Sequence, residues 1–572
     1  MLWDYIVVGG GLSGSVVSNR LLQQDDSLKI LLIEAGPNAN DQNIWPNATN
    51  TIGGTYDWRL TSTPQAHVDN RSITLAQGKA LGGGTLINMG LWTRGDRSEY
   101  DIWSKIVGDK RWSYDGLLPY MKKTELYWNH TTNSEQHGYE GRVHLQTPNS
   151  TNRTYPLRQK VLQSWEQVGV SALPFLDANA GDIHGVAEFS ECRDQGRRQT
   201  ASAIYSLDGI TVLTDTLVAK VLITGPEGCP SASGIQLDNG TIIFGHEVIL
   251  AAGAVHTPQL LMLSGIGPKV ELSKHGIPVK KDLPDVGNNY ADHLLSPSAW
   301  KVKNPEQGWA LGSSNPVFKS AANALGSSAD FVVTTSIKGD GLAKAIEADE
   351  GRAPSPDHPL LRNGAFFEHI MLYTGSTDGS RVSFSGISLS PMSRGSVTLA
   401  SADISDPPVI DPNYLATAVD RYVYREGVRQ EVAVAGSTQT VLGREILDGE
   451  AQPEGFDQPY TPDSTDEYID ARIRATARSV HHPMGTAAMG NVVDTNLRVK
   501  GVCGLRIVDA SVLPVVIPTH LMVAVYAVAE QAAEIILQDQ KQGTKCIPPP
   551  ERENSGTSTT KCERWTMGSA PQ

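Results

Sequence analysis

The sequence has little of what marks several classes of protein. Its formal net charge is -14 at pH 7, which argues against nucleic acid as a partner because phosphates require a basic surface. No apolar run reaches about 18 residues, the length that spans a bilayer. The longest candidate, Leu521–Ala529, is followed by Glu530 and Glu534 and indicates a buried helix. We therefore expect neither nucleic acid nor membrane as a partner.

Cysteine is also scarce. The five cysteines are too few and too scattered for a disulfide scaffold or a zinc site, so no metal is expected. Cys546 and Cys562 bracket a Pro-rich C-terminal tail (543–572) and are a candidate disulfide pair.

Glycosylation sequons are, by contrast, frequent. They stand at Asn47, Asn70, Asn129, Asn149, Asn152 and Asn239. Sequons also arise by chance, but six in one chain favour a secreted, extracellular glycoprotein. No signal peptide is visible, because an apolar strand begins at Trp3, so we expect the mature form.

The length of 572 residues exceeds one simple domain, and 40% hydrophobic with 19% charged residues is typical of a globular protein. The N-terminal stretch organises the chain. A buried strand, Tyr5–Val8, precedes three glycines in G-x-G-x-x-G spacing and a helix over Ser15–Gln24. The glycines are Gly9, Gly11 and Gly14.

This arrangement is typical of a dinucleotide site. Gly9 permits the tight turn, Gly11 lets the backbone approach a pyrophosphate, and Gly14 lets the helix pack on the strand. A second apolar strand, Lys29–Ile33, ends at Glu34, which can accept from a ribose hydroxyl. A purely structural Gly-rich turn is the alternative, and the register of strand, glycines, helix and acid favours the dinucleotide.

Residues 37–251 contain a predicted loop, a Gly-rich segment and several short strands. Residues 37–77 have no sustained periodicity and predict a long loop, for example a lid. Residues 78–88 contain a Gly cluster that allows backbone to lie against a ligand or, alternatively, forms a flexible turn. Short β-type runs at 211–214, 217–223, 234–237 and 241–244 predict a small meander. A buried strand over 247–251 then leads into a helix.

Two of these segments carry a resemblance to a family. Residues 78–101 are similar throughout to the first characteristic motif of the glucose–methanol–choline (GMC) oxidoreductases, with Lys79 where Arg is more usual. Residues 253–267 are similar to the second motif at every constrained position. The resemblance implies an α/β fold (α+β overall), with a doubly wound FAD-binding domain and a second substrate domain of antiparallel sheet backed by helices.

The resemblance extends to about residue 541 and implies a domain layout. The FAD-binding domain covers 1–294, with some substrate-domain insertions and the lid loop of 37–77. The substrate-binding domain covers 295–477, in which 338–353 is charged and predicts a surface excursion. Residues 478–542 return to the FAD-binding domain, and 543–572 form the tail.

Two histidines near the C-terminus are the candidate catalytic residues. Oxidising an alcohol removes a proton from oxygen and a hydride from carbon, and FAD accepts the hydride. Neutral histidine is a suitable base, and a second donor steadies the developing alkoxide. The resemblance gives His482 the role of base and His520 the second position. His293, beside Asp292, is predicted to be structural because no nucleophile is in evidence.

The resemblance also implies the FAD contacts, with Val218 meeting adenine. They are Gly9, Gly11, Leu12, Ser13, Gly14, Glu34, Ala35, Gly78, Leu81, Gly82, Gly83, Gly84, Thr85, Asn88, Met89, Gly90, Leu91, Val218, Ala252, Gly253, Asp509, Ala510, His520, Leu521 and Met522. No His stands in residues 91–93, where members with covalent flavin place theirs, so we expect non-covalent FAD.

The leading hypothesis is a secreted FAD-dependent oxidoreductase that resembles the fungal aryl-alcohol and glucose oxidase group. It oxidises a primary alcohol, aryl or other, to an aldehyde, and O2 or a quinone reoxidises the flavin. The predicted substrate pocket contains His481, Arg478 and Trp92. Arg478 favours a sugar, whereas Val480 stands where glucose-oxidising members use Asn. An aromatic content of only 6% gives little support to an aryl pocket.

Other functions stay open. A sugar oxidase or dehydrogenase is one alternative, and a non-redox FAD-containing lyase or cyclase is another. A binding protein on an inactive scaffold is a third, although the site residues are intact. We expect a monomer or a homodimer.

Overall fold

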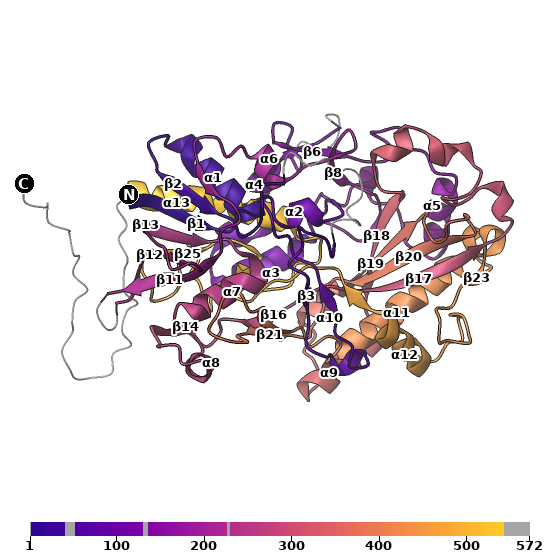
Figure 1. Cartoon of the computed structure of the whole chain (residues 1–572). Coiled ribbons are helices and arrows are strands. Elements are labelled where there is room, and N and C mark those ends of the chain that lie inside the picture. The colour runs from indigo at the N-terminus through magenta and orange to yellow at the C-terminus, as the bar shows by residue number, and fades with distance from the viewer. Residues whose placement is uncertain (1, 40–51, 130–134, 226–228, 543–572) are drawn as a thin grey trace, which may run out of the picture.

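The computed structural model describes residues 2–39, 52–129, 135–225 and 229–542. Two seven-stranded sheets stand at opposite ends of the molecule, each with its own helices (Figure 1). This confirms the predicted mixed fold with a doubly wound sheet and a separate antiparallel one. None of the helices in these ranges combines the length and the apolar composition that crossing a bilayer requires.

The first sheet is built around β1. Its spatial order is β10 (Thr211–Leu213), β2 (Ile30–Ile33), β1 (Leu2–Val8), β13 (Ile242–Leu250), β12 (Ser231–Leu237) and β11 (Val218–Thr224), and β25 (Leu505–Ile507) also pairs with β13. β10, β2, β1, β13 and β25 are parallel, whereas β12 and β11 are antiparallel. Residues 5–8 are entirely buried, as expected for a parallel strand covered on both faces.

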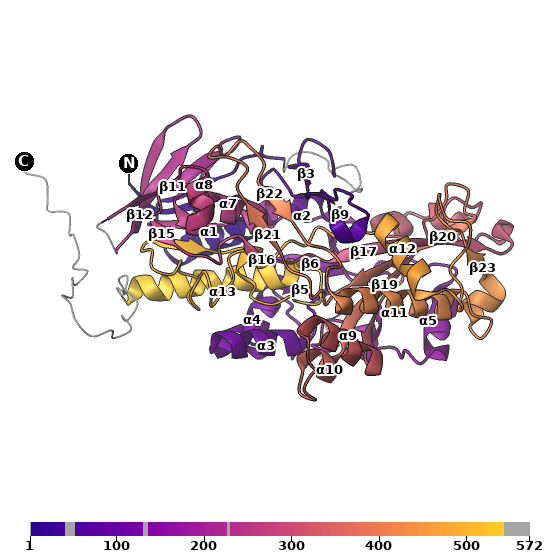
Figure 2. The ribbon, with the colours of Figure 1, turned by 90° about the horizontal axis from the view of Figure 1, so that it is seen from below.

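A helical layer covers the first sheet. α13 (Met522–Lys541) packs against both α1 (Leu12–Gln24) and α4 (Tyr114–Thr124), and Figure 2 shows it running along the molecule between them. α13 is therefore apolar on nearly all sides. Its buried carboxylate, Glu530, is neutralised by Arg20 at 2.7 Å and Lys123 at 3.1 Å, as a buried charge requires.

The second sheet is antiparallel throughout. Its order is β23 (Leu447–Glu450), β17 (Leu294–Val302), β20 (Arg381–Ser388), β19 (Ala365–Leu372), β18 (Phe331–Ile337) and β7 (Gly185–Glu188), and β24 (Arg478–Ser479) also pairs with β17. α11 (Ala418–Ala435) packs on β18, β19 and β20, and α9 (Asp340–Glu350) and α12 (Asp466–Thr476) pack on α11. β7 therefore belongs to the second sheet, although it lies within residues 1–294, the predicted FAD-binding domain.

Smaller elements connect the two sheets. The strands are β3 (Leu60–Thr61), β4 (Thr74–Leu75), β5 (Glu125–Leu126), β6 (Val143–Gln146), β8 (Glu191–Asp194), β9 (Arg197–Arg198), β14 (Ile266–Gly267), β15 (Lys281–Asp282), β16 (Asn288–Tyr290), β21 (Gly395–Thr398) and β22 (Val409–Asp411). The helices are α2 (Gly84–Ile87), α3 (Arg97–Val107), α5 (Arg158–Gln167), α6 (Ala201–Ile204), α7 (Gly253–Leu263), α8 (Lys269–Lys274) and α10 (Pro359–Asn363).

Several predicted elements are corrected. β10 pairs with β2 in parallel and does not belong to the predicted meander. The runs at 241–244 and 247–251 form one continuous strand, β13. Residues 338–353 are mostly exposed, in agreement with a surface location, but they contain the helix α9, which buries Leu342, Ala345 and Ile346 and packs on α11.

Two further predictions concern loops and cysteines. The predicted 37–77 loop contains the β3–β4 pair, while its residues 40–51 lie outside the described residues. Cys229 and Cys503 are both disulfide-bonded, which the scatter of the cysteines did not indicate. The backbone joins their neighbourhoods, since the N–H of Cys503 donates to the carbonyl of Pro230 at 2.9 Å. The predicted Cys546–Cys562 pair lies outside the described residues.

The glycine of the first turn of α1 yields a test of this packing. A Cβ at Gly14 would lie 1.9 Å from the carbonyl oxygen of Gly9, so Gly14→Ala forces the β1–α1 turn apart. We expect the free energy of unfolding to fall by about 1–3 kcal/mol, the cost of overpacking. Chemical denaturation of the holoprotein measures it.

Ser18→Ala, one helical turn further along α1, is the matched control. The Ser18 hydroxyl is buried and has no hydrogen-bond partner within the described residues, so its loss leaves stability nearly unchanged. Equal midpoints for the two variants would contradict the close packing.

Candidate active site

A cavity of about 360 Å³ opens at the carboxyl ends of the parallel strands. Val8 at the end of β1, Ile33 at the end of β2 and Ala251 after β13 all line it. Open α/β sheets bind their ligands at this edge, where loops and helix starts converge. The opposite wall comes from residues 480–483 and 520–522, which follow β24 and precede or begin α13.

Apart from the single-turn helix α2, three helices begin at the cavity without a side-chain cap. They are α1, α7 and α13, and their N-cap residues are Gly11, Ala252 and Leu521. Four helices that begin elsewhere are capped by the side chains of Asp96, Ser113, Thr417 and Thr465. The first N–H of α7, that of Gly253, donates to Asp509 at 2.9 Å. The other first-turn N–H groups of these helices are left to face the cavity, an arrangement that binds phosphate groups.

The far end of the cavity contains a buried acid. Glu34 accepts backbone N–H groups from Gly10 at 2.8 Å and from Gly36 at 2.9 Å, one on each oxygen. Burial raises the pKa of Glu34, against the lowering effect of these two hydrogen bonds. Each oxygen keeps a lone pair for a second donor, so Glu34 is placed to accept from ribose hydroxyls.

At two glycines the main chain itself forms the cavity wall, because no side chain covers it. A Cβ at Gly84 or Gly253 would meet no protein atom within 4 Å, so open space stands directly above both residues. Free helix N-termini, a ribose acceptor and bare backbone together fit a dinucleotide, and the cavity is long enough to join Glu34 to His482 and His520. The residues present fit FAD.

Most predicted cofactor contacts lie on the cavity wall. The exceptions are Gly14, Leu81 and Gly82, which support the wall from behind. Gly14 packs on Gly9, and the N–H of Gly82 donates to the carbonyl of Gly10 at 2.8 Å. All three residues belong to the motifs that predicted the contacts. The motifs alone therefore did not separate residues on the cavity wall from residues behind it.

Two predicted pocket residues are corrected. Trp92 is fully buried outside the cavity wall, and its indole N–H points to Glu125 at 3.3 Å. Arg478 is exposed on β24 and does not line the cavity. His481 does line it. Its Nδ1 accepts the N–H of Ala76 at 3.0 Å, so its remaining proton is on Nε2.

The sequence also missed lining residues. Trp58 and His256 both line the cavity, with their ring centroids 4.2 Å apart and the rings tilted by 42°. Burial lowers the pKa of His256 to about 4, so its ring is neutral. Trp58 lies in the loop that lacks periodicity, which offered no signal for it.

The two candidate catalytic histidines meet in the cavity. The rings of His482 and His520 are 4.9 Å apart and nearly perpendicular. Burial lowers the pKa of His482 well below its ordinary value, with smaller contributions from the charges of the surrounding histidines. His482 is therefore neutral, as a base must be.

His520 has an acidic neighbour. Its Nε2 lies 2.9 Å from Oε1 of Glu368, a buried residue on β19. A carboxylate only accepts, so Nε2 of His520 carries a proton. Sequence reasoning missed Glu368, because it stands in the stretch 295–475 that showed little pattern.

His482 has a neutral neighbour. Nδ1 of His293 lies 3.0 Å from Nδ1 of His482, and His293 is completely buried. The prediction gave His293 a structural role because no nucleophile was in evidence. The structure brings it into direct contact with the candidate base.

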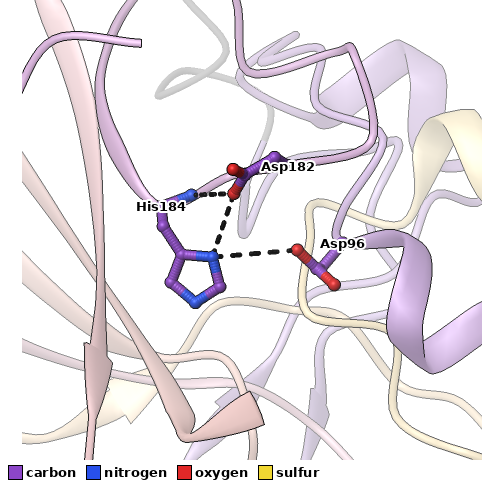
Figure 3. Close-up of side chains that lie close together, drawn as sticks. All are labelled: Asp96, Asp182 and His184. Atoms are coloured by element: carbon purple, nitrogen blue, oxygen red, sulfur yellow. Dashed lines mark hydrogen bonds and ion pairs between the residues drawn. The ribbon is translucent and has the colours of Figure 1, made fainter.

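One acidic cluster lies outside the cavity. Figure 3 shows Nδ1 of His184 facing Asp182 at 3.0 Å and Asp96 at 3.9 Å. Ligand atoms of the three residues lie within 4.8 Å of one another. Asp96 already caps α3 by accepting the N–H of Ser98 at 2.9 Å, so the cluster is accounted for as the tie between a loop and a helix start.

Comparison with known proteins places this geometry in a family. Two family models, both described as GMC oxidoreductase, match residues 3–295 and 391–529. The GMC-type oxidoreductase acuG of Aspergillus aculeatus is 38% identical, over 94% of this chain and 99% of the relative. An alcohol dehydrogenase [acceptor] of Pseudomonas putida is 29% identical, over 94% and 96%.

The likeness extends to three dimensions. The structure of a fungal aryl-alcohol oxidase superposes with a TM-score of 0.78 at 26% identity, covering 94% of this chain and 99% of that one. Because the family models match more than half of the residues, the chain belongs to the GMC oxidoreductase family and takes FAD as its cofactor.

Proposed function

We propose that this chain is a secreted enzyme that oxidises a primary alcohol to an aldehyde, and that O2 or a quinone reoxidises its flavin. The observation that carries the proposal is the meeting of a neutral and a carboxylate-paired imidazole, His482 and His520, in one cavity with three uncapped helix N-termini.

The cavity residues divide between the parts of FAD. The N-termini of α1 and α7 are placed for the pyrophosphate, and Glu34 for the adenosine ribose. Asn88 and Met522 line the same cavity as the two histidines and are placed for the ring end. When bound, FAD supplies the acceptor for the substrate hydride.

The histidines supply the proton chemistry. His482, neutral and buried, takes the proton when the O–H bond of the alcohol breaks. His520, with Glu368 behind it, donates to the oxygen as negative charge develops there. A neutral base beside a hydrogen-bond donor suits an alcohol that becomes alkoxide-like in the transition state.

The wall beside His482 favours a primary alcohol over a sugar. Val480 and Pro483 flank the base and are apolar, and Trp58 adds an aromatic surface to the same cavity. Arg478, the residue that favoured a sugar, lies outside the wall. A sugar would bring several hydroxyls to a surface with few partners for them.

Exposed sequons and a disulfide support secretion. Asn70, Asn149, Asn152 and Asn239 are exposed, and Cys229 and Cys503 are disulfide-bonded, as is common outside the cytosol. A mass loss on endoglycosidase treatment of protein from a secreting host would agree with this proposal, and an unchanged mass would contradict it.

Removing the base tests the catalytic assignment. We expect His482→Ala to slow flavin reduction by about 10²–10⁴-fold, the usual contribution of a general base, while FAD stays bound. His520→Ala gives a smaller loss, because it removes a donor and not the base. Stopped-flow absorbance under anaerobic conditions measures both.

His67→Ala is the matched control, since His67 is exposed and distant from the cavity wall. Flavin reduction in His482→Ala at the control rate would remove His482 from the role. A panel of alcohols and sugars, read by peroxide and by dye reduction, then identifies the substrate class and the acceptor. Bound flavin that no alcohol reduces would favour the lyase or cyclase alternative.

The pH dependence follows from the lowered pKa of His482. An imidazole with the ordinary pKa of 6.5 loses half of its neutral form at pH 6.5, whereas His482 stays neutral to lower pH. We therefore expect the rate of flavin reduction to change less than about twofold between pH 8 and pH 6. A decline centred near pH 6.5 would contradict the low pKa.

A further inference from the structure

His293 and His482 lie on two segments that pair by backbone hydrogen bonds. The N–H of Val480 donates to the carbonyl of His293 at 2.9 Å. Ala291 and Met484 exchange two hydrogen bonds, each of 3.0 Å. The segments 291–294 and 479–484 are thus held in antiparallel register on both sides of the histidines. Backbone geometry, and not chance side-chain contact, fixes the two imidazoles.

The contact between the rings has only two chemical solutions. Nδ1 of His293 and Nδ1 of His482 are 3.0 Å apart, so one carries the hydrogen and the other accepts it. If His293 donates, neutral His482 must carry its own proton on Nε2 and has no lone pair there. If His482 donates, its Nε2 is the free lone pair. Only the second solution gives a base at Nε2.

The cavity favours the second solution. Nδ1 of His482 is taken up by His293, so only Nε2 of His482 is left to face the substrate. A base needs a lone pair there, which places the proton of neutral His482 on Nδ1 and makes Nδ1 of His293 the acceptor. Burial and His520 together lower the pKa of His293 to about 3, so its ring is neutral and its own proton stands on Nε2.

We propose that His293 is a positioning residue that holds His482 in its Nδ1–H form, with the Nε2 lone pair turned to the alcohol. This inference rests on the proposed function, because it takes His482 as the base. When Nε2 receives the proton of the alcohol, the N–H bond at Nδ1 still points to His293, which accepts it without taking the proton.

Asp292, next to His293 in the chain, binds the backbone of His482. It accepts the backbone N–H of His482 at 2.8 Å and the hydroxyl of Ser479 at 2.5 Å, and it also accepts the hydroxyl of Tyr414. These three bonds engage both of its oxygens. A carboxylate on Nδ1 would stabilise a charged His482 before the alcohol binds. The neutral imidazole of His293 orients the ring of His482 and does not favour its charged form.

Two substitutions separate orientation from packing. His293→Leu keeps the volume of the buried site but removes the acceptor, and we expect the limiting rate of flavin reduction to fall at least about 100-fold, since a misassigned tautomer is costly. His293→Asn places an amide oxygen near the position of Nδ1 and restores the rate to within about tenfold of wild type. In both variants bound FAD and the apparent dissociation constant for the alcohol stay near wild type.

The tautomer itself is measured on the FAD-bound wild-type enzyme. Histidine labelled with ¹⁵N, with His482→Ala to assign the signal, reports which ring nitrogen of His482 carries the proton. We expect Nδ1 to be protonated and Nε2 unprotonated without any alcohol present. The opposite assignment would overturn the proposal, and so would a wild-type rate of flavin reduction in His293→Leu.

The outcomes distinguish this proposal from the proposed function. If no alcohol reduces the flavin, the function fails, and the ¹⁵N spectrum still decides the tautomer. If His293→Leu loses FAD or fails to fold, the spectrum of the wild type and the rate of His293→Asn decide instead. A rate in His293→Asn as low as that of His482→Ala would overturn the role of the acceptor.

Discussion

The pairing of residues 291–294 with 479–484 is the constraint on which the site depends. It joins the start of the second sheet to the segment that carries His482, and three different groups of residues 291–293 bind backbone or side chain of that segment. The second histidine is anchored separately, since the backbone N–H of His520 donates to Thr93 at 3.3 Å. Two rings from distant parts of the chain thereby meet without a mobile loop, as catalysis requires.

The two imidazoles have different neighbours. Their centroids are 4.9 Å apart in a buried site, so a positive charge on one ring disfavours a charge on the other. Nε2 of His520 donates to Glu368, while burial above all leaves His482 neutral. The site therefore pairs a base with a hydrogen-bond donor, although both are histidines. Their neighbours, and not the residue type, determine the roles.

The cofactor half of the site could be predicted from sequence because its contacts are local. Glu34 and the glycines before it come from one contiguous strand–turn–helix. In the catalytic half, the resemblance gave His482 and His520, but the partner of His520 could not be predicted, because Glu368 reaches it only through the register of the second sheet. Trp92 and Arg478 were wrongly placed in the pocket because each stands near a motif in the sequence. Closeness to a motif does not determine whether a side chain points into the cavity.

The same geometry links binding to stability. Helices such as α3, which begin away from the cavity, complete their first turn with a side chain such as Asp96. The N-cap residues of α1, α7 and α13 provide no such cap, and α13 is also the buried helix that packs against α1 and α4. Asp509 accepts the N–H of Gly253 in α7, and the other first-turn N–H groups are left to what occupies the cavity. A ligand that binds the folded state alone stabilises it by mass action. FAD therefore stabilises the first domain when it binds the uncapped helix ends. Without FAD, the same helix ends lower the stability of the folded protein.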